Sequence, residues 1–269
     1  MTGPRPVLNG RPGTMPYTVS SHINIHNMSY NDSLTKGSPA GEPKGMIYYN
    51  EHSKVLVSVD CIIFGFGEGK LRVLIGRRRL NPGRGQWSLY GGFVRNNESI
   101  DDAANRVLYD LTGLHNLYMR QVGAFGSVDR DPGERVISIV YYALINTSDY
   151  DEELRLKHEV KWINIDELPQ MYSDHNEMVA KARRMMQEKI SREPISFRLL
   201  PDLFTLTQLQ RLYEAVCGEE VDKRNFRKRI KDMDFIEKTE QIDKTGSKRG
   251  AYLYRFNKKA YNEEPNFKL

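Results

Sequence analysis

Cysteine is scarce in this chain. The 269 residues contain only two, Cys61 and Cys217, and they lie far apart in the sequence. Cys61 falls in an apolar run and Cys217 near the end of a predicted helix. This placement favours two buried thiols in a reducing compartment over a disulfide or a metal site.

Long hydrophobic runs are also lacking. No apolar run approaches the roughly 20 residues needed to span a bilayer, and the first residues do not show the basic-then-apolar pattern of a signal peptide. We therefore expect a cytosolic protein. The net charge is only +5, so the location of the basic residues tells more about partners than their sum.

Hydrophobic residues make up a modest 39% of the chain, which is nevertheless long enough for two domains. Residues 1–48 are rich in Pro, Gly, Ser and Asn and show no hydrophobic period, so we expect a disordered tail there. From Val55 onward, short β-branched runs alternate with Gly-containing turns, and one amphipathic helix follows the third run. This order predicts a mixed α/β domain over 49–170.

After Pro169 the pattern becomes predominantly helical. A helix with apolar residues at helical spacing is expected within 171–195, as a linker between two domains. The following helix has a Thr205-to-Gln208 capping box and ends at Gly218. Helix, turn, basic helix and a hairpin then follow, which predicts a winged helix-turn-helix over 196–269.

The stretch "GGFVRNNESIDDAANRVLYDLTGL" contains the amphipathic helix of the first domain. Ser99 can cap its start with Asp102 three residues on, and Gly113 lies where a helix usually ends. The stretch resembles the Nudix box, G-x5-E-x7-R-E-U-x-E-E-x-G-U with U aliphatic. Gly92, Glu98, Arg106 and Gly113 fall in register, and Leu108 and Leu114 take aliphatic positions. The resemblance covers roughly residues 55–168 and implies a Nudix-like α/β/α sandwich.

The departures from this motif bear on activity. In hydrolysing Nudix proteins the three carboxylates of the box bind divalent cations, which need oxygen ligands. The corresponding positions here hold Val107, Asp110 and Leu111. Since two of the three ligands are aliphatic, we expect an apolar surface in place of the metal face, no catalytic residues, no metal and no cofactor. We expect Glu98 to pair with Arg106 instead.

The segment "KRNFRKRIK", residues 223–231, is strongly basic and is the second candidate functional element of the chain. Asp222 is a natural N-cap, and Phe226 and Ile230 give one apolar face with which the helix can dock. An isolated run of this kind is usually a solvated charged face. Its place in a winged helix favours double-stranded DNA as the partner instead. We assign Arg224, Asn225 and Lys228 to base edges, and Arg227, Lys244, Lys248 and Arg249 to phosphates.

The combination of a degenerate Nudix domain with a winged helix resembles the Nudix-related transcriptional regulators. In that family a small effector occupies the Nudix pocket and alters a DNA-binding homodimer. The sequences "VDCIIFGF", "WSLYGGFV" and "FRKRIKDMDFIEK" most resemble those of the arabinose-responsive AraR-like branch. We therefore expect a repressor of sugar utilisation with an effector such as L-arabinose. The alternative is an ADP-ribose-responsive regulator of NAD metabolism, as in the NrtR group. The candidate effector-binding residues are Arg77, Arg79, Phe93, Arg130, Asp131 and Arg135.

Two other functions remain open from the sequence. The chain could be a Nudix hydrolase of nucleoside diphosphate derivatives, with metal ligands relocated to Glu98, Asp110 or Glu134. It could also be an interaction module whose basic region binds acidic surfaces. A hydrolysis screen and a sequence-specific DNA-binding assay separate these possibilities from a regulator.

Overall fold

The first domain is built on a seven-stranded mixed sheet. The computed structural model describes residues 52–150, 157–245 and 249–263, so the tail expected over 1–48 lies outside the described residues. The central strands β1 (Leu56–Gly67) and β6 (Val136–Asn146) run parallel, and the other strand pairs are antiparallel. The strand order is β3-β2-β1-β6-β5, with β4 also paired to β1 and β7 to β2. The remaining strands are β2 (Lys70–Arg77), β3 (Trp87–Ser88), β4 (Tyr90–Phe93), β5 (Tyr118–Phe125) and β7 (Val160–Asn164).

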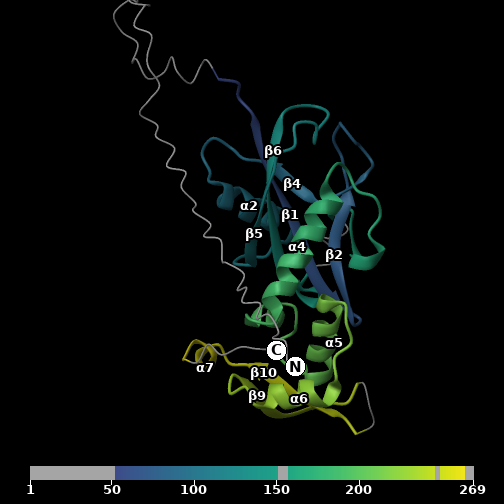
Figure 1. Ribbon diagram of the computed structural model, residues 1–269, viewed down its shortest axis with the longest axis vertical. Coiled ribbons are helices and arrows are strands. Elements are labelled where there is room, and N and C mark those ends of the chain that lie inside the picture. The colour runs from purple at the N-terminus through teal and green to yellow at the C-terminus, as the bar shows by residue number, and fades with distance from the viewer. Residues whose placement is uncertain (1–51, 151–156, 246–248, 264–269) are drawn as a thin grey trace, which may run out of the picture. The chain divides into compact units, whose positions relative to one another are not determined.

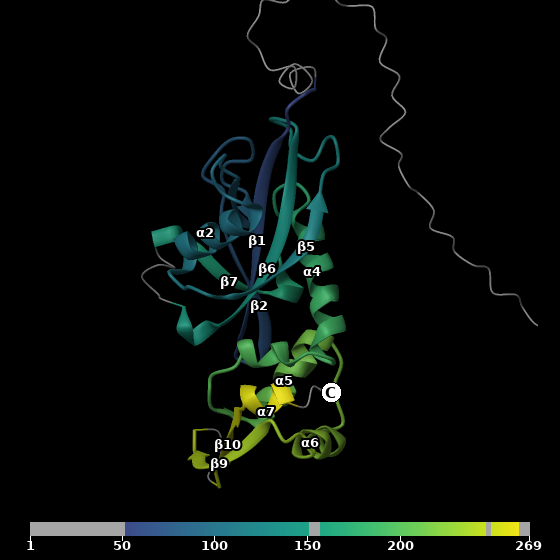
Figure 2. The ribbon, with the colours of Figure 1, turned by 90° about the vertical axis from the view of Figure 1, so that its left-hand side faces the viewer.

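Two helices cover the two faces of this sheet, as Figures 1 and 2 show. Alternation along β1 sends Cys61 and Ile63 to the helix α2 (Ile100–Thr112), whereas Ile62 and Phe64 face the helix α4 (His175–Ile190). Both faces are therefore buried, and the domain has the expected α/β/α layers.

Helix α2 has the ends that the sequence predicts. Ser99 caps it in a reciprocal capping box with Asp102, and Gly113 ends it in the left-handed conformation with φ 68°. Two short 3-10 segments, η1 (Thr147–Asp149) and η2 (Ile165–Glu167), flank β7. Cys61 is buried and Cys217 half-buried, and both are free thiols.

Helix α4 is more than the linker expected over 171–195. Its buried side chains pack against the sheet of the first domain, because its apolar residues recur on one face; these are Met178, Val179, Ala182, Met186 and Ile190. The helix is thus one of the two layers that complete this domain.

The second domain is a winged helix. After the 3-10 segment η3 (Pro194–Arg198) come β8 (Phe204–Thr205), α5 (Leu206–Cys217), α6 (Lys223–Lys231), β9 (Ile236–Asp243), β10 (Ala251–Phe256) and α7 (Lys258–Glu263). The predicted capping box at Thr205 and Gln208 and the N-cap at Asp222 are confirmed. A short three-stranded sheet, β8-β10-β9, supports the two helices. The sequence patterns did not predict β8 or α7.

The described elements from residue 54 onward form one compact unit, in which α5 contacts both α4 and β2. Within the part of the chain that the structure describes, no helix is both long and apolar enough to cross a bilayer.

Candidate functional site

A cavity of about 360 Å³ opens between β1, β2, β4, the loop after β5 and the start of α4. Five of the six residues expected to bind an effector line it, namely Arg77, Arg79, Phe93, Arg130 and Asp131. Arg135 is not among the lining residues. Its guanidinium donates to the carbonyl oxygens of Gly126 and Ser127 at 2.9 and 3.1 Å, so it holds the loop between β5 and β6.

Three consecutive arginines line the side of the cavity formed by the end of β2 and the residues after it. The guanidinium of Arg77 lies 3.7 Å from the centre of a Trp87 ring and donates to the carbonyl of Gly85. That of Arg78 lies over the ring of Tyr172, at 4.3 Å. Arg79 donates to the carbonyl of Lys157 at 3.1 Å. Stacking leaves guanidinium edges available to anions, so this wall suits phosphate oxygens.

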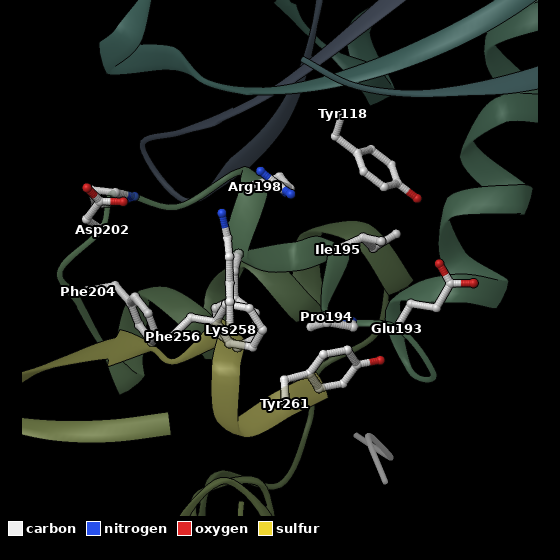
Figure 3. Close-up of a pocket in the computed structure, with 12 residues that line it drawn as sticks. Tyr118, Glu193, Pro194, Ile195, Arg198, Asp202, Phe204, Phe256, Lys258 and Tyr261 are labelled. Carbon is white, nitrogen blue, oxygen red and sulfur yellow. The ribbon is translucent and has the colours of Figure 1, made fainter. Parts of the chain in front are cut away.

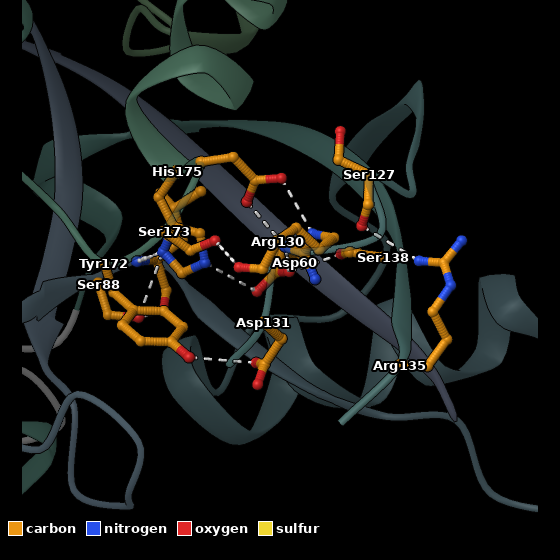
Figure 4. A network of polar contacts seen from close by, with 12 residues as sticks. Asp60, Ser88, Ser127, Arg130, Asp131, Arg135, Ser138, Tyr172, Ser173 and His175 are labelled. Carbon is orange, nitrogen blue, oxygen red and sulfur yellow. Dashed lines mark hydrogen bonds and ion pairs between the residues drawn. The ribbon is translucent and has the colours of Figure 1, made fainter. Parts of the chain in front are cut away.

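The base of the cavity holds a buried polar network (Figure 4). Arg130, whose side chain is 5% exposed, donates twice to the carboxylate of Asp174, at 2.8 and 2.9 Å. Burial by itself raises the pKa of Asp174, but the bonded Arg130 outweighs burial and lowers that pKa. The same guanidinium lies 3.9 Å from Asp60, which also accepts a hydrogen bond from the Ser138 hydroxyl at 2.5 Å.

His175 completes this network as the first residue of α4. Its Nδ1 accepts the backbone N–H of Leu89 at 3.1 Å, which assigns the ring proton to Nε2. Burial lowers the pKa of His175, and the negative charges of Asp60 and Asp174 oppose this effect only in part. The ring is therefore neutral at pH 7, with an Nε2–H that faces the Oδ1 atom of Asp60 at 3.9 Å.

Two glycines of β4 make room for these contacts. A Cβ atom on Gly91 would lie 2.3 Å from Oδ1 of Asp60 and 2.6 Å from the backbone carbonyl of Val59. One on Gly92 would lie 3.2 Å from Val107, so the glycine of the Nudix box permits close packing of β4 on α2.

The altered metal positions lie in the core. Val107 is 4% exposed and Leu111 is 1% exposed, packed with residues of β1 and β6 beneath α2. Both side chains thus lie on the apolar face of the amphipathic helix that the sequence predicts, and this face packs on the sheet. Asp110 remains exposed. Two aliphatic side chains cannot ligate a cation, and the described residues contain no group of three or more His, Cys, Asp or Glu suited to a metal ion. This helix therefore does not fit the magnesium site of the hydrolases.

The predicted pairing of Glu98 with Arg106 is confirmed. Arg106 donates to both carboxylate oxygens, at 2.6 and 2.9 Å, and to the carbonyl of Phe93. The hydrogen bonds from Arg106 lower the pKa of Glu98 to about 2. The pair fixes the loop before α2 to the helix.

Sequence reasoning missed the buried part of the cavity. Asp60, Ser88 and Ser138 come from three different strands, and Asp174 and His175 from the start of α4, so no local pattern in the sequence brings the five together. The available signal was Asp60, a single charged residue within the apolar run "VSVDCIIFGF". A buried charge requires partners, so this residue was a sign of a polar site.

A larger hollow of about 540 Å³ lies beside η3, β5, β10 and α7 (Figure 3). Its buried lining residues, Ile195 and Phe204, are apolar, and Glu193 is paired with Arg120 and Lys189. Its other charged residues are exposed. Because the smaller cavity concentrates the buried polar groups, we regard it as the candidate effector site.

Helix α6 forms a basic surface in the second domain. Phe226 and Ile230 are buried as predicted, and the other face lines an open groove. Arg224, Asn225 and Lys228 are exposed in this groove. The groove therefore presents the three residues that we assign to base edges.

The residues assigned to phosphates are placed less uniformly. Arg227 lines the groove but is half-buried, with its guanidinium 3.5 Å from the Thr207 hydroxyl of α5. Lys244 and Arg249 are exposed next to the β9–β10 turn, and Lys248 lies outside the described residues.

Comparison with known proteins agrees with this two-part architecture. The NUDIX domain model matches residues 54–182, and the model "NrtR DNA-binding winged helix domain" matches residues 196–256. The ADPR responsive transcriptional repressor NtrR of Acinetobacter baylyi is 31% identical over 211 residues, which cover 77% of this chain and 84% of that protein. The chain belongs to the NrtR family.

Two further relatives fit this assignment. The crystal structure of Shewanella oneidensis NrtR in complex with a 27mer DNA has a TM-score of 0.69 and 26% identity, over 77% of this chain and 95% of that one. The ADP-ribose pyrophosphatase of Methanocaldococcus jannaschii is 32% identical over 123 residues, which cover 46% of this chain and 70% of that protein. These NrtR-family and ADP-ribose relatives favour the ADP-ribose alternative, and they do not support the expected arabinose-responsive branch.

Proposed function

We propose that this protein is a transcriptional repressor that binds operator DNA through α6 and the β9–β10 wing, and that ADP-ribose is the effector of its Nudix domain. The observation that carries the proposal is the joining of two sites in one chain. One is a cavity lined by arginines beside a Nudix helix without its metal ligands, and the other is an exposed basic helix in a winged helix. The repressor from Acinetobacter baylyi, whose name records a response to ADPR, supports it.

The charge of the cavity supports a diphosphate ligand. Without a cation, the two negative charges of a diphosphate need guanidinium or ammonium groups as partners. Four arginines line the cavity, Arg77, Arg78, Arg79 and Arg130, against two carboxylates, Asp60 and Asp131. Arg130 and Arg79 are also paired with Asp174 and Glu159 outside the lining, so the support for a diphosphate comes chiefly from Arg77 and Arg78, whose guanidinium groups stack on aromatic rings. Arginine is the side chain best suited to forked contacts with phosphate oxygens. The site can thus hold the diphosphate that the family's enzymes hold through metal ions.

The same observations argue against hydrolysis as the function. Cleavage of a diphosphate in this fold depends on cations that activate water. Val107 and Leu111 occupy two of the three positions at which hydrolases carry a metal-binding carboxylate, and both side chains are buried. The protein binds the nucleotide without turning it over.

Helix α4 provides a route from the cavity to the DNA-binding domain. His175 at its first turn lines the cavity. Three turns later, the carboxamide of Gln187 donates to the carbonyl oxygens of Val216 and Cys217 at the end of α5, at 2.8 and 3.4 Å. A ligand that moves the start of α4 therefore changes the support of α5, against which α6 packs.

We further propose a homodimer that acts on genes of NAD metabolism. One winged helix contacts too few base pairs for genomic specificity, and two copies read symmetric half-sites.

The test measures DNA binding and hydrolysis in parallel. DNA sequences are first enriched from a random pool with the full chain, and the affinity of the enriched duplex is then measured by fluorescence anisotropy at 150 mM salt. We expect saturating ADP-ribose to change this affinity at least tenfold. Failure to enrich a sequence, or an affinity that ADP-ribose leaves unchanged, contradicts the proposal.

The hydrolysis arm uses the Methanocaldococcus jannaschii ADP-ribose pyrophosphatase as its control. We expect release of AMP from ADP-ribose with Mg²⁺ to be at least about 1,000-fold slower than in that enzyme, since two metal ligands are missing. A comparable rate identifies the protein as a hydrolase instead.

A further inference from the structure

The base of the cavity contains a donor and an acceptor that face each other without touching. Nε2 of His175 carries the ring hydrogen, because Nδ1 accepts the N–H of Leu89. Across from it, Oδ1 of Asp60 lies 3.9 Å away, beyond hydrogen-bond distance. The His175 side chain is 4% exposed and yet lines the cavity. A donor that reaches a cavity can bond to a ligand or to water there, and neither residue supplies a partner to the other.

The surrounding contacts fix both groups in place. Ser138 occupies Oδ2 of Asp60, and Gly91 leaves room for Oδ1. The ring of His175 is held by Leu89 on one side and stands edge-on to the ring of Tyr172 on the other. Neither side chain can turn away without breaking these contacts, so the pair is preorganised for a third group.

Hydroxyl groups match this arrangement. A ligand hydroxyl that accepts from Nε2–H of His175 can donate its own hydrogen to Oδ1 of Asp60. A vicinal diol satisfies the pair with two adjacent hydroxyls. A phosphate matches poorly, because the Asp60 carboxylate repels it and it has no hydrogen to donate at neutral pH.

Burial indicates which end of a ligand reaches this pair. The residues at the cavity mouth are exposed, with Leu80 at 73% and Phe93 at 57%. Asp60 and His175 are 8% and 3% exposed, which places them at the inner end. A ligand whose diphosphate contacts the arginines can place only a terminal group there, and the polar lining suits a sugar better than an adenine ring.

We propose that Asp60 and His175 form a subsite for the diol of a terminal ribose and so set the preference for ADP-ribose over ADP. This inference rests on the proposed function, since it assigns one part of the same effector. It names two specificity-determining residues in addition to the arginines. The two nucleotides share the adenosine diphosphate part, but ADP-ribose adds the terminal sugar and ADP carries a further negative charge on its terminal phosphate. The contribution of the subsite is therefore the change in their affinity ratio between wild type and each variant.

The test measures the dissociation constants of ADP-ribose and ADP by calorimetry, in full-length wild type, Asp60→Asn and His175→Asn. Asparagine at 175 keeps an acceptor near the N–H of Leu89 but lacks a donor at the Nε2 position. We expect wild type to prefer ADP-ribose at least tenfold, and both variants to lose most of this preference while their affinity for ADP stays within about threefold. Asp129→Asn is the matched control, because Asp129 is an exposed carboxylate of the same loop and is not among the residues that line the cavity. It should keep the wild-type ratio.

The outcomes separate the two proposals. If wild type does not bind ADP-ribose, the proposed function is wrong and the subsite with it. If wild type binds ADP-ribose and the variants keep its preference over ADP, the subsite alone is wrong. A variant that loses affinity for both nucleotides equally also overturns the subsite, because the residue then supports the whole cavity. Thermal unfolding of each variant identifies a loss of folding, and Ser138→Ala then provides a second, milder change that frees Oδ2 of Asp60 and should lower the preference without removing either group.

Discussion

At the scale of single residues, Leu111 tests whether α2 retains a metal-binding face or has an apolar, buried face in its place. Its side chain is 1% exposed under α2, at a position where hydrolases carry a metal-binding carboxylate. We predict that Leu111→Glu lowers the free energy of unfolding by roughly 3 kcal/mol or more, because a buried carboxylate here has no partner. Urea unfolding measures the change.

The neighbouring position Tyr109 supplies the control for this variant. Tyr109 is 45% exposed on the same helix and stacks on the ring of His115, so Tyr109→Glu should lower the free energy of unfolding by about 1 kcal/mol or less. If Leu111→Glu were as stable as wild type and gained Mg²⁺-dependent cleavage of ADP-ribose, the metal face would be intact and our account of this helix would fail.

At the scale of elements, the pair Glu98 and Arg106 joins the loop before α2 to the helix. The pKa of Glu98 falls from its ordinary value of 4.5 to about 2 in the folded chain, chiefly through hydrogen bonds from Arg106. The unfolded chain therefore takes up this proton first as the pH falls, and the stabilisation is present above pH 4.5 and lost between 4.5 and about 2. We predict that Glu98→Gln is less stable at pH 7 and loses stability less steeply across that window.

Urea midpoints measured at steps from pH 7 to pH 2 test the Glu98 prediction. Glu134→Gln, which alters an exposed carboxylate of the β5–β6 loop, should follow the wild-type curve. A Glu98→Gln curve parallel to wild type would show that the ion pair contributes nothing to the pH dependence.

The elements also show what a sequence can predict. The ends of α2, α5 and α6 depend on neighbouring residues such as Ser99, Thr205 and Asp222, and all three were predicted correctly. The cavity base depends on residues from β1, β3, β6 and α4 that meet only in the folded sheet, and Asp60 and His175 were missed. The burial of Val107 and Leu111, in contrast, agrees with the helical spacing of apolar residues in α2, which is a local pattern.

At the scale of the whole molecule, the proposed function requires that a ligand in the cavity change the equilibrium constant of DNA binding. In that function the cavity recognises its ligand through a few buried groups, whereas the DNA surface combines base contacts with long-range attraction to phosphates. These contributions can be separated because only the phosphate contacts release counterions, and their effect appears in the salt dependence of binding.

Lys244 and Arg224 carry the last prediction, since both are exposed in the winged helix but are assigned different roles. Lys244→Ala should weaken binding to specific and random duplexes alike and reduce the slope of log K against log salt by about 1, as expected for one lost phosphate contact. Arg224→Ala should instead reduce the difference in binding free energy between specific and random DNA by about 1–3 kcal/mol, because it removes a base contact. Lys161→Ala, an exposed lysine of β7, controls for the loss of one positive charge far along the chain from the winged helix. Equal slopes for wild type and Lys244→Ala would show that this residue of the wing does not contact DNA phosphates. An unchanged ratio of specific to random affinity in Arg224→Ala would show that Arg224 does not recognise bases.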